Sequence, residues 1–170
     1  MQEQTSQDSM RFLTLTLGKE HFAIGIDSVR EILDYTDVTR IPQAPPYMRG
    51  VVNVRGAAVP VMDLAQKLAL GEVGRTIHTR IVIMEVMRNE ETAVVGVLAD
   101  SVKEVLEIPM ASIAPPPHLG SQAGAACLRG IANHEGRFIL LLDLSQVFAT
   151  DEIQDLSAML GGNDVETPAA

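Results

Sequence analysis

The sequence has few aromatic residues and almost no cysteine. Aromatic residues make up 4% of its 170 positions and tryptophan is absent, whereas 46% are hydrophobic, so aliphatic side chains must fill the core. The one cysteine, Cys127, cannot form an internal disulfide, which fits a reducing compartment. The polar N-terminus lacks an apolar signal segment, and no apolar run reaches the roughly 18 residues that span a bilayer. A soluble, cytoplasmic protein is predicted.

The sequence also lacks a basic region. Its formal net charge is −9, but five acids and no base lie within residues 151–170, so the preceding chain is nearly balanced. Nucleic acids and anionic membrane surfaces attract proteins with a clustered basic face. Neither is therefore expected as a partner, and no direct membrane contact is predicted.

The chain does contain an internal repeat. Residues 47–68 align without a gap with residues 127–148, and residues 26–33 align with residues 99–106 at an offset of 73. Such a repeat indicates a duplicated module, in which shared residues are best explained by structure and unshared ones are better candidates for function. The identical pairs of the longer match are Arg49/Arg129, Gly50/Gly130, Asn53/Asn133, Gly56/Gly136, Asp63/Asp143, Leu64/Leu144 and Gln66/Gln146.

Alternating apolar residues and Gly or Pro turns predict short strands. Asp63 and Asp143 are each expected to cap a short helix, the first over residues 64–70. Short strands with one short helix per module favour an all-β fold of two small five-stranded barrels, since closure removes exposed edges. The expected strands cover residues 12–17, 22–26, 50–53, 57–62, 80–86 and 93–98.

The expected organisation is one domain over residues 12–150. It comprises a first barrel module over 12–70 and a second over 80–150, and the exchange of strands between them is left open. A flexible N-terminus over 1–11 precedes the domain. A C-terminal helix over 151–160 and a disordered acidic tail over 161–170 follow it.

Candidate catalytic and metal-binding residues all have a simpler structural explanation. None of the histidines, at positions 21, 78, 118 and 134, has a His or Cys partner at metal-ligand spacing. Cys127 lacks the motif context of a nucleophile, and its counterpart in the other copy is Tyr47. Capping explains Asp63 and Asp143 better than a catalytic pair does. No enzyme activity, cofactor or metal is predicted.

Arg55 stands out because its counterpart is Glu135, so the fold does not need an arginine there. A guanidinium in a turn suits recognition of a partner's carboxylate or carbonyl groups. Glu31 is matched by Glu104, and Val29 by Val102. Spacing alone leaves open whether these valines belong to the core or to an exposed docking patch.

These motifs, in this order and spacing, resemble the CheW family of bacterial chemotaxis coupling proteins over about residues 12–150. The family usually has Leu at the position of Val54. The motifs are Asp27-Ser28-Val29-Arg30-Glu31-Ile32, Ile41-Pro42-x-Ala44-Pro45, the stretch from Arg49 to Gly56, and the stretch from Val59 to Leu64.

The resemblance implies two SH3-like five-stranded β-barrels packed around a shared intermediate core. It implies a non-enzymatic adaptor that couples the cytoplasmic tip of a chemoreceptor to the regulatory domain of the histidine kinase CheA, in membrane-associated arrays. Ring assembly with CheA or other CheW copies is also implied. The receptor groove would involve Leu13, Ile26, Val29, Glu31, Gly50, Asn53, Arg55, Gly56, Val86 and Val102.

Two alternatives keep the fold. The chain could serve a chemosensory pathway that controls pili or second-messenger output, or it could be the coupling half of a fusion with a receiver domain. Only about 20 residues follow the second module, too few for a receiver, which favours an intact small protein.

Overall fold

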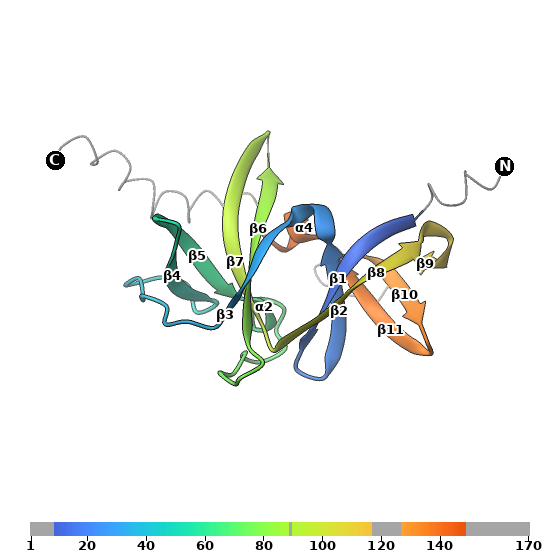
Figure 1. Ribbon diagram of the computed structural model, residues 1–170, viewed down its shortest axis with the longest axis horizontal. Coiled ribbons are helices and arrows are strands. Elements are labelled where there is room, and N and C mark those ends of the chain that lie inside the picture. Colours follow the sequence, from blue (N-terminus) through green and yellow to red (C-terminus); the bar gives the residue numbers. More distant parts are fainter. Residues whose placement is uncertain (1–8, 89, 117–126, 149–170) are drawn as a thin grey trace.

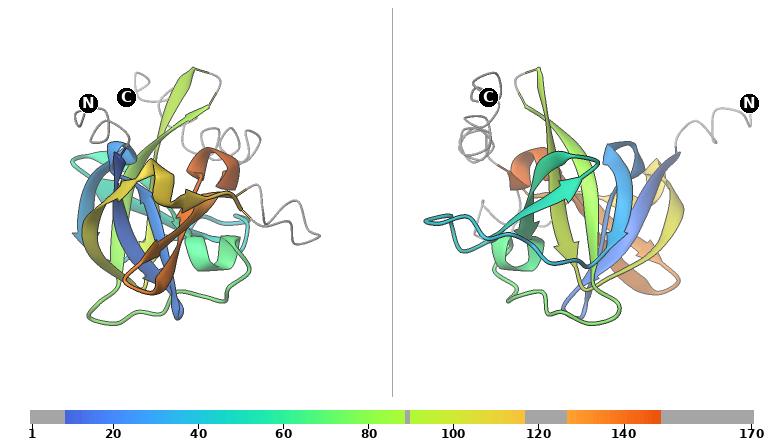
Figure 2. Two further views of the ribbon diagram at one scale, coloured as in Figure 1. Left: turned by 90° about the vertical axis from the view of Figure 1, so that its right-hand side faces the viewer. Right: turned by 60° about the vertical axis from the view of Figure 1, so that its left-hand side comes forward.

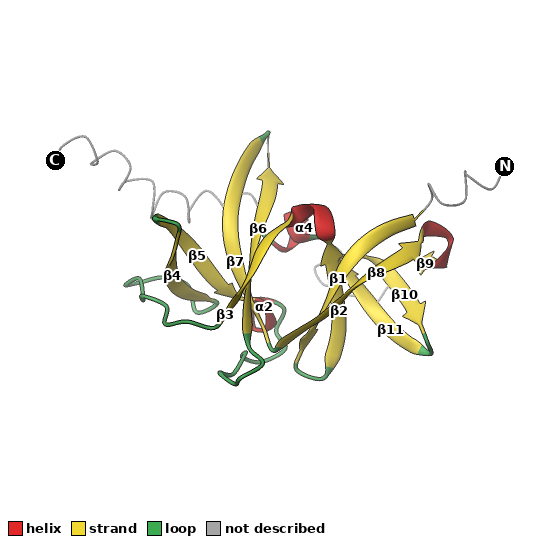
Figure 3. Ribbon diagram, viewed as in Figure 1, coloured by secondary structure: helices red, strands yellow, loops and turns green. Residues whose placement is uncertain are grey.

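The structure, a computed structural model, describes residues 9–88, 90–116 and 127–148 (Figure 1). Strands dominate it, and each of the helices is short (Figure 3). The elements in chain order are β1 (Ser9–Leu17), β2 (Glu20–Gly25), the 3-10 helix η1 (Ile26–Ser28), β3 (Val29–Asp34), β4 (Met48–Val54), β5 (Ala57–Asp63), α2 (Leu64–Lys67), β6 (Arg80–Arg88), β7 (Glu91–Ala99), β8 (Ser101–Pro109), the 3-10 helix η2 (Met110–Ser112), β9 (Ile113–Ala114), β10 (Leu128–His134), β11 (Arg137–Leu142) and α4 (Leu144–Val147).

The strands form two sheets that do not follow the two halves of the sequence. One sheet has the order β3-β6-β7-β5-β4, and the other has the order β8-β1-β2-β11-β10-β9. We call the sheet that contains β3, β4 and β5 the first sheet and the one that contains β8 to β11 the second sheet. The hairpin β1–β2 belongs to the first repeat but lies in the second sheet. The hairpin β6–β7 belongs to the second repeat but lies in the first sheet. The predicted boundaries of 12–70 and 80–150 thus mark the repeats, whereas each sheet draws strands from both.

The two sheets have the same internal arrangement. In the first, β5 runs parallel to β7, with Val61 opposite Gly96. In the second, β11 runs parallel to β2, with Leu141 opposite Ala23. These pairs are related by the repeat offsets of 80 and 73, so the exchange preserves the register of the duplicated module. The prediction of an all-β fold with two packed barrels is confirmed.

One core joins the two sheets. Leu13, Leu15 and Leu17 of β1 are buried together with residues of β5, β6 and β7. Phe12, which precedes Leu13 and points to the opposite face of the strand, belongs to a smaller cluster within the second sheet. β1 therefore supplies apolar side chains to both clusters. At one end, strands β6 and β7 extend away from this core (Figure 2).

Some element boundaries differ from the predicted ones. β1 begins at Ser9, inside the segment expected to be flexible, because its first residues pair with the end of β8. The helix expected over 64–70 is only one turn, since Ala69 adopts a left-handed φ of 63°. The helix expected over 151–160 and the tail over 161–170 lie outside the described residues.

Gly50 and Gly130 occupy equivalent points of close backbone contact. A Cβ at Gly50 would lie 2.1 Å from the Thr39 carbonyl oxygen, and one at Gly130 would lie 2.7 Å from the Ala114 carbonyl oxygen. Thr39 pairs with Val51 as Ala114 pairs with Ile131, and Val51 and Ile131 are related by the repeat offset of 80. Both glycines are therefore required by the sheet itself.

We expect Gly50→Ala to lower the free energy of unfolding by roughly 2–4 kcal/mol, because the new methyl group meets fixed backbone. Gly74→Ala is the matched control, since a Cβ there meets nothing within 4 Å, and its effect should stay below about 1 kcal/mol. Urea unfolding of both variants measures the difference. Equal effects would show that the contact at Thr39 does not limit this position.

Candidate partner-binding site

An exposed ion pair joins β3 to the turn between β4 and β5. Arg55 donates from Nε to Oε2 of Glu31 at 3.4 Å and from Nη2 to Oε1 at 3.3 Å, so the contact is bidentate. The side chain of Arg55 is 81% exposed and that of Glu31 is 27% exposed. The hydrogen bond to Glu31, together with its charge, raises the pKa of Arg55 above its ordinary value. The pair leaves the guanidinium exposed to solvent beside a carboxylate that is mostly covered.

The turn that carries Arg55 has the same construction in both copies. Arg55 and Glu135 each adopt φ 54°. The Asn53 side chain accepts a hydrogen bond from the Gly56 amide at 2.8 Å, and Asn133 does the same for Gly136 at 3.1 Å. The side chain at the first turn position is therefore free to differ. This supports the inference that Arg55 is not needed for folding.

The apolar residues of the predicted groove differ in their exposure. Ile26, Val29 and Val102 are half-buried and pack against the main core. Leu13 and Val86 are only 3% exposed, so they lie beneath the surface and support it. The sequence left open whether Val29 and Val102 belong to the core or to an exposed patch. In the structure both valines pack against the core and are also partly accessible to solvent.

Gly50 and Asn53 have structural roles in the same region. Gly50 is buried and allows the close approach of Thr39, and the Asn53 side chain holds its turn. The structure therefore brings together Glu31 and Arg55, with Asn53 and Gly56 in the adjoining turn.

Sequence reasoning found the capping role of Asp63 but missed its other partners. The side chain is fully buried, and it accepts the Gln66 amide at 3.0 Å. It also accepts Nη2 of Arg49 at 2.8 Å and the Val73 amide at 2.9 Å. The only indication of the Arg49–Asp63 ion pair in the sequence was that both residues are identical between the two copies. A second missed ion pair joins Arg30 of β3 to Glu85 of β6 at 3.3 Å.

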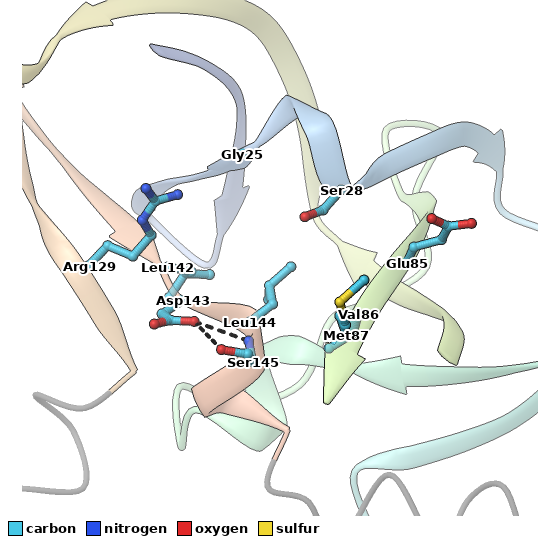
Figure 4. Close-up of a pocket in the computed structure, with 10 residues that line it drawn as sticks. All are labelled: Gly25, Ser28, Glu85, Val86, Met87, Arg129, Leu142, Asp143, Leu144 and Ser145. Atoms are coloured by element: carbon cyan, nitrogen blue, oxygen red, sulfur yellow. Dashed lines mark hydrogen bonds between the residues drawn. The ribbon is translucent and has the colours of Figure 1, made fainter. Parts of the chain in front are cut away.

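A pocket of about 350 Å³ opens beside α4 (Figure 4). Both sheets contribute to its walls, together with η1. Its lining residues are Gly25, Ser28, Glu85, Val86, Met87, Arg129, Leu142, Asp143, Leu144 and Ser145.

A second pocket, of about 200 Å³, contains several ionisable side chains of the second sheet. Arg137 Nη1 contacts His21 Nε2, and because a guanidinium can only donate, Nε2 must be the hydrogen-bond acceptor. Burial, followed by the charges of Arg137 and Lys103, lowers the pKa of His21 below 6.5, and Glu20 opposes this. Within residues 9–88, 90–116 and 127–148, no three His, Cys, Asp or Glu side chains are arranged to hold a metal.

A family model for the CheW-like domain matches residues 11–152. The chain belongs to the CheW-like family. Over the part of the chain that the structure describes, no helix is long and apolar enough to cross a membrane.

Proteins called chemotaxis protein CheW resemble this chain over most of their length. A chemotaxis protein CheW of Rhizobium meliloti (strain 1021) is 34% identical over 82% of this chain and 88% of that protein. A chemotaxis protein CheW of Klebsiella aerogenes is 33% identical over 84% of this chain and 83% of that protein. The crystal structure of the scaffolding protein TtCheW from Thermoanaerobacter tengcongensis matches this one with a TM-score of 0.73 and 29% sequence identity. The match covers 84% of this chain and 90% of that chain. The predicted family is confirmed, and the chain is a CheW-like scaffold of chemotaxis signalling.

We expect stability to fall as the pH drops below about 6.5, because the folded state holds His21 neutral beside Arg137 and Lys103. This contribution is fully present above the unfolded-state pKa of histidine and is lost as the pH falls through the lower folded-state pKa. Thermal unfolding between pH 8 and pH 5 measures it. His21→Gln should flatten the profile relative to wild type, and a variant profile as steep as that of wild type would contradict this assignment.

Proposed function

We propose that this CheW-like chain couples the cytoplasmic tips of chemoreceptors to the histidine kinase CheA in membrane-associated arrays. Two observations support the proposal. The family model covers both barrels, and in the first sheet an exposed Arg55 of one turn pairs with Glu31 of β3, whereas the second copy has Glu135 in place of Arg55. A scaffold needs such a specific surface and no catalytic group.

A chemoreceptor tip is a bundle of antiparallel helices, and an apolar strip can take one face of such a helix. In this proposal Ile26, Val29 and Val102 provide the strip, supported from beneath by Leu13 and Val86. The adjoining polar groups set the register and orientation of the helix more than its affinity. The CheA regulatory domain and further CheW copies would join other surfaces in rings, where many weak contacts act together.

We expect Arg55→Glu to weaken binding of a chemoreceptor-tip hairpin by about tenfold, because it places two acids together and removes the guanidinium fork. Isothermal titration calorimetry of the full chain with the hairpin measures this affinity. Glu135→Arg, in the equivalent turn of the other sheet, is the matched control and should leave the affinity unchanged. Unaltered binding by a folded Arg55→Glu protein would remove this site.

A charge exchange separates partner recognition from internal structure. The double variant Glu31→Arg with Arg55→Glu can rebuild the ion pair within the chain but reverses the charges shown to a partner. We expect thermal unfolding close to that of wild type and binding as weak as that of Arg55→Glu. Restored binding in the double variant would mean that the ion pair between positions 31 and 55 only stabilises the turn between β4 and β5. The partner would then contact neither charge specifically.

A further inference from the structure

The alignment between the two copies continues beyond the residues first compared. Past Leu68 and Phe148 it still needs no gap, and two of the next five positions are identical while a third exchanges two β-branched residues. These pairs are Ala69/Ala149, Glu72/Glu152 and Val73/Ile153. The segment after α4 therefore repeats the segment after α2.

In the first copy this segment closes over the capping aspartate. Val73 is 2% exposed, and its amide donates to Oδ2 of Asp63 at 2.9 Å. Arg49 fixes the arrangement, because it donates both to the same carboxylate oxygen and to the Val73 carbonyl, at 2.8 and 2.7 Å. The side chain of Val73 thus fills a niche beside Asp63, and its backbone amide hydrogen-bonds to the Asp63 carboxylate.

Within the described part of the chain, no residue occupies the equivalent position beside Asp143 in the second copy. Asp143 uses Oδ1 to accept the amide and the hydroxyl of Ser145, at 3.2 and 2.7 Å, and no described residue donates to its Oδ2. Arg129 is turned away from Asp143 (Figure 4), toward Met10 Sδ at 3.5 Å and the ring of Phe12. The pocket of about 350 Å³ lies at this position.

We propose that the C-terminal segment of this chain docks into the pocket, with the Ile153 side chain in the place that Val73 has in the first copy and the Ile153 amide donating to Oδ2 of Asp143. The reach is sufficient, because Ile153 follows the end of α4 by six residues, as Val73 follows the end of α2. Asp151 and Glu152, which directly precede Ile153, are opposite in charge to Arg129, the one base among the lining residues, whereas Glu85 and Asp143 are the acids there.

The docking is compatible with the helix predicted over 151–160. The first four amides of a helix have no partner within it, so the Ile153 amide would remain available to Asp143. The short tether also favours this occupant over a separate protein, because it gives the segment a high effective concentration at the pocket.

Amide hydrogen exchange by NMR on the full chain tests the proposal. We expect the Ile153 amide to exchange about tenfold more slowly than in an unstructured chain, or slower still. Asp143→Asn keeps one oxygen for the cap but replaces the second by a donor, so it should release the Ile153 amide while Val73 stays protected. Asp63→Asn is the matched control and should release Val73 alone.

An Ile153 amide that exchanges freely in the wild type would overturn the proposal, as would protection that survives Asp143→Asn. Ile153→Asp should abolish protection at position 153, whereas Gln154→Asp, which adds the same charge one residue later, should keep it. Equal effects of these two variants would contradict docking of the Ile153 side chain. If Ile153 is free and a chemoreceptor-tip hairpin instead shifts the Arg129 and Asp143 signals, the pocket serves a partner and the proposal is wrong.

Discussion

The fold depends on the exchange of hairpins between the two halves of the chain. Neither sheet can be completed by one repeat, because β1–β2 pairs with β8 and β11 while β6–β7 pairs with β3 and β5. The exchange also fuses the apolar interiors, since β1 places side chains in both clusters. We therefore expect the two barrels to unfold as one cooperative unit, and the surface at their junction has a defined geometry.

The duplication made much of this predictable from sequence. The strands, the glycine turns and the aspartate caps follow from local chemistry, and they occur twice. The exchange was not predictable in the same way, because contiguous and exchanged barrels have identical strands and differ only in long-range pairing. The identity of Gly50 and Gly130 indicated a structural role, but the carbonyl that Gly50 approaches lies in a loop without a recognisable pattern.

The candidate site was predictable where the two copies differ. Arg55 faced Glu135 in the alignment, and the structure shows it paired with Glu31, which the family resemblance had placed in the same groove without indicating the contact. The buried contacts of Asp63 were not visible, because a short linker supplies one of the partners. Likewise, alternation on β1 and β6 could not show that Leu13 and Val86 lie under the surface, since burial there depends on the opposing sheet.

The strand exchange has a consequence for the order of folding. Thr14 of β1 bonds to Glu104 of β8, a separation of 90 positions, and long-range pairing of this kind slows folding through the entropy of closing large loops. During synthesis the first hairpin emerges long before its partners, with the apolar face of β1 uncovered. Nascent chains of this type therefore pass through a long interval in which neither barrel exists, and in which an unpaired strand edge is open to association with another chain.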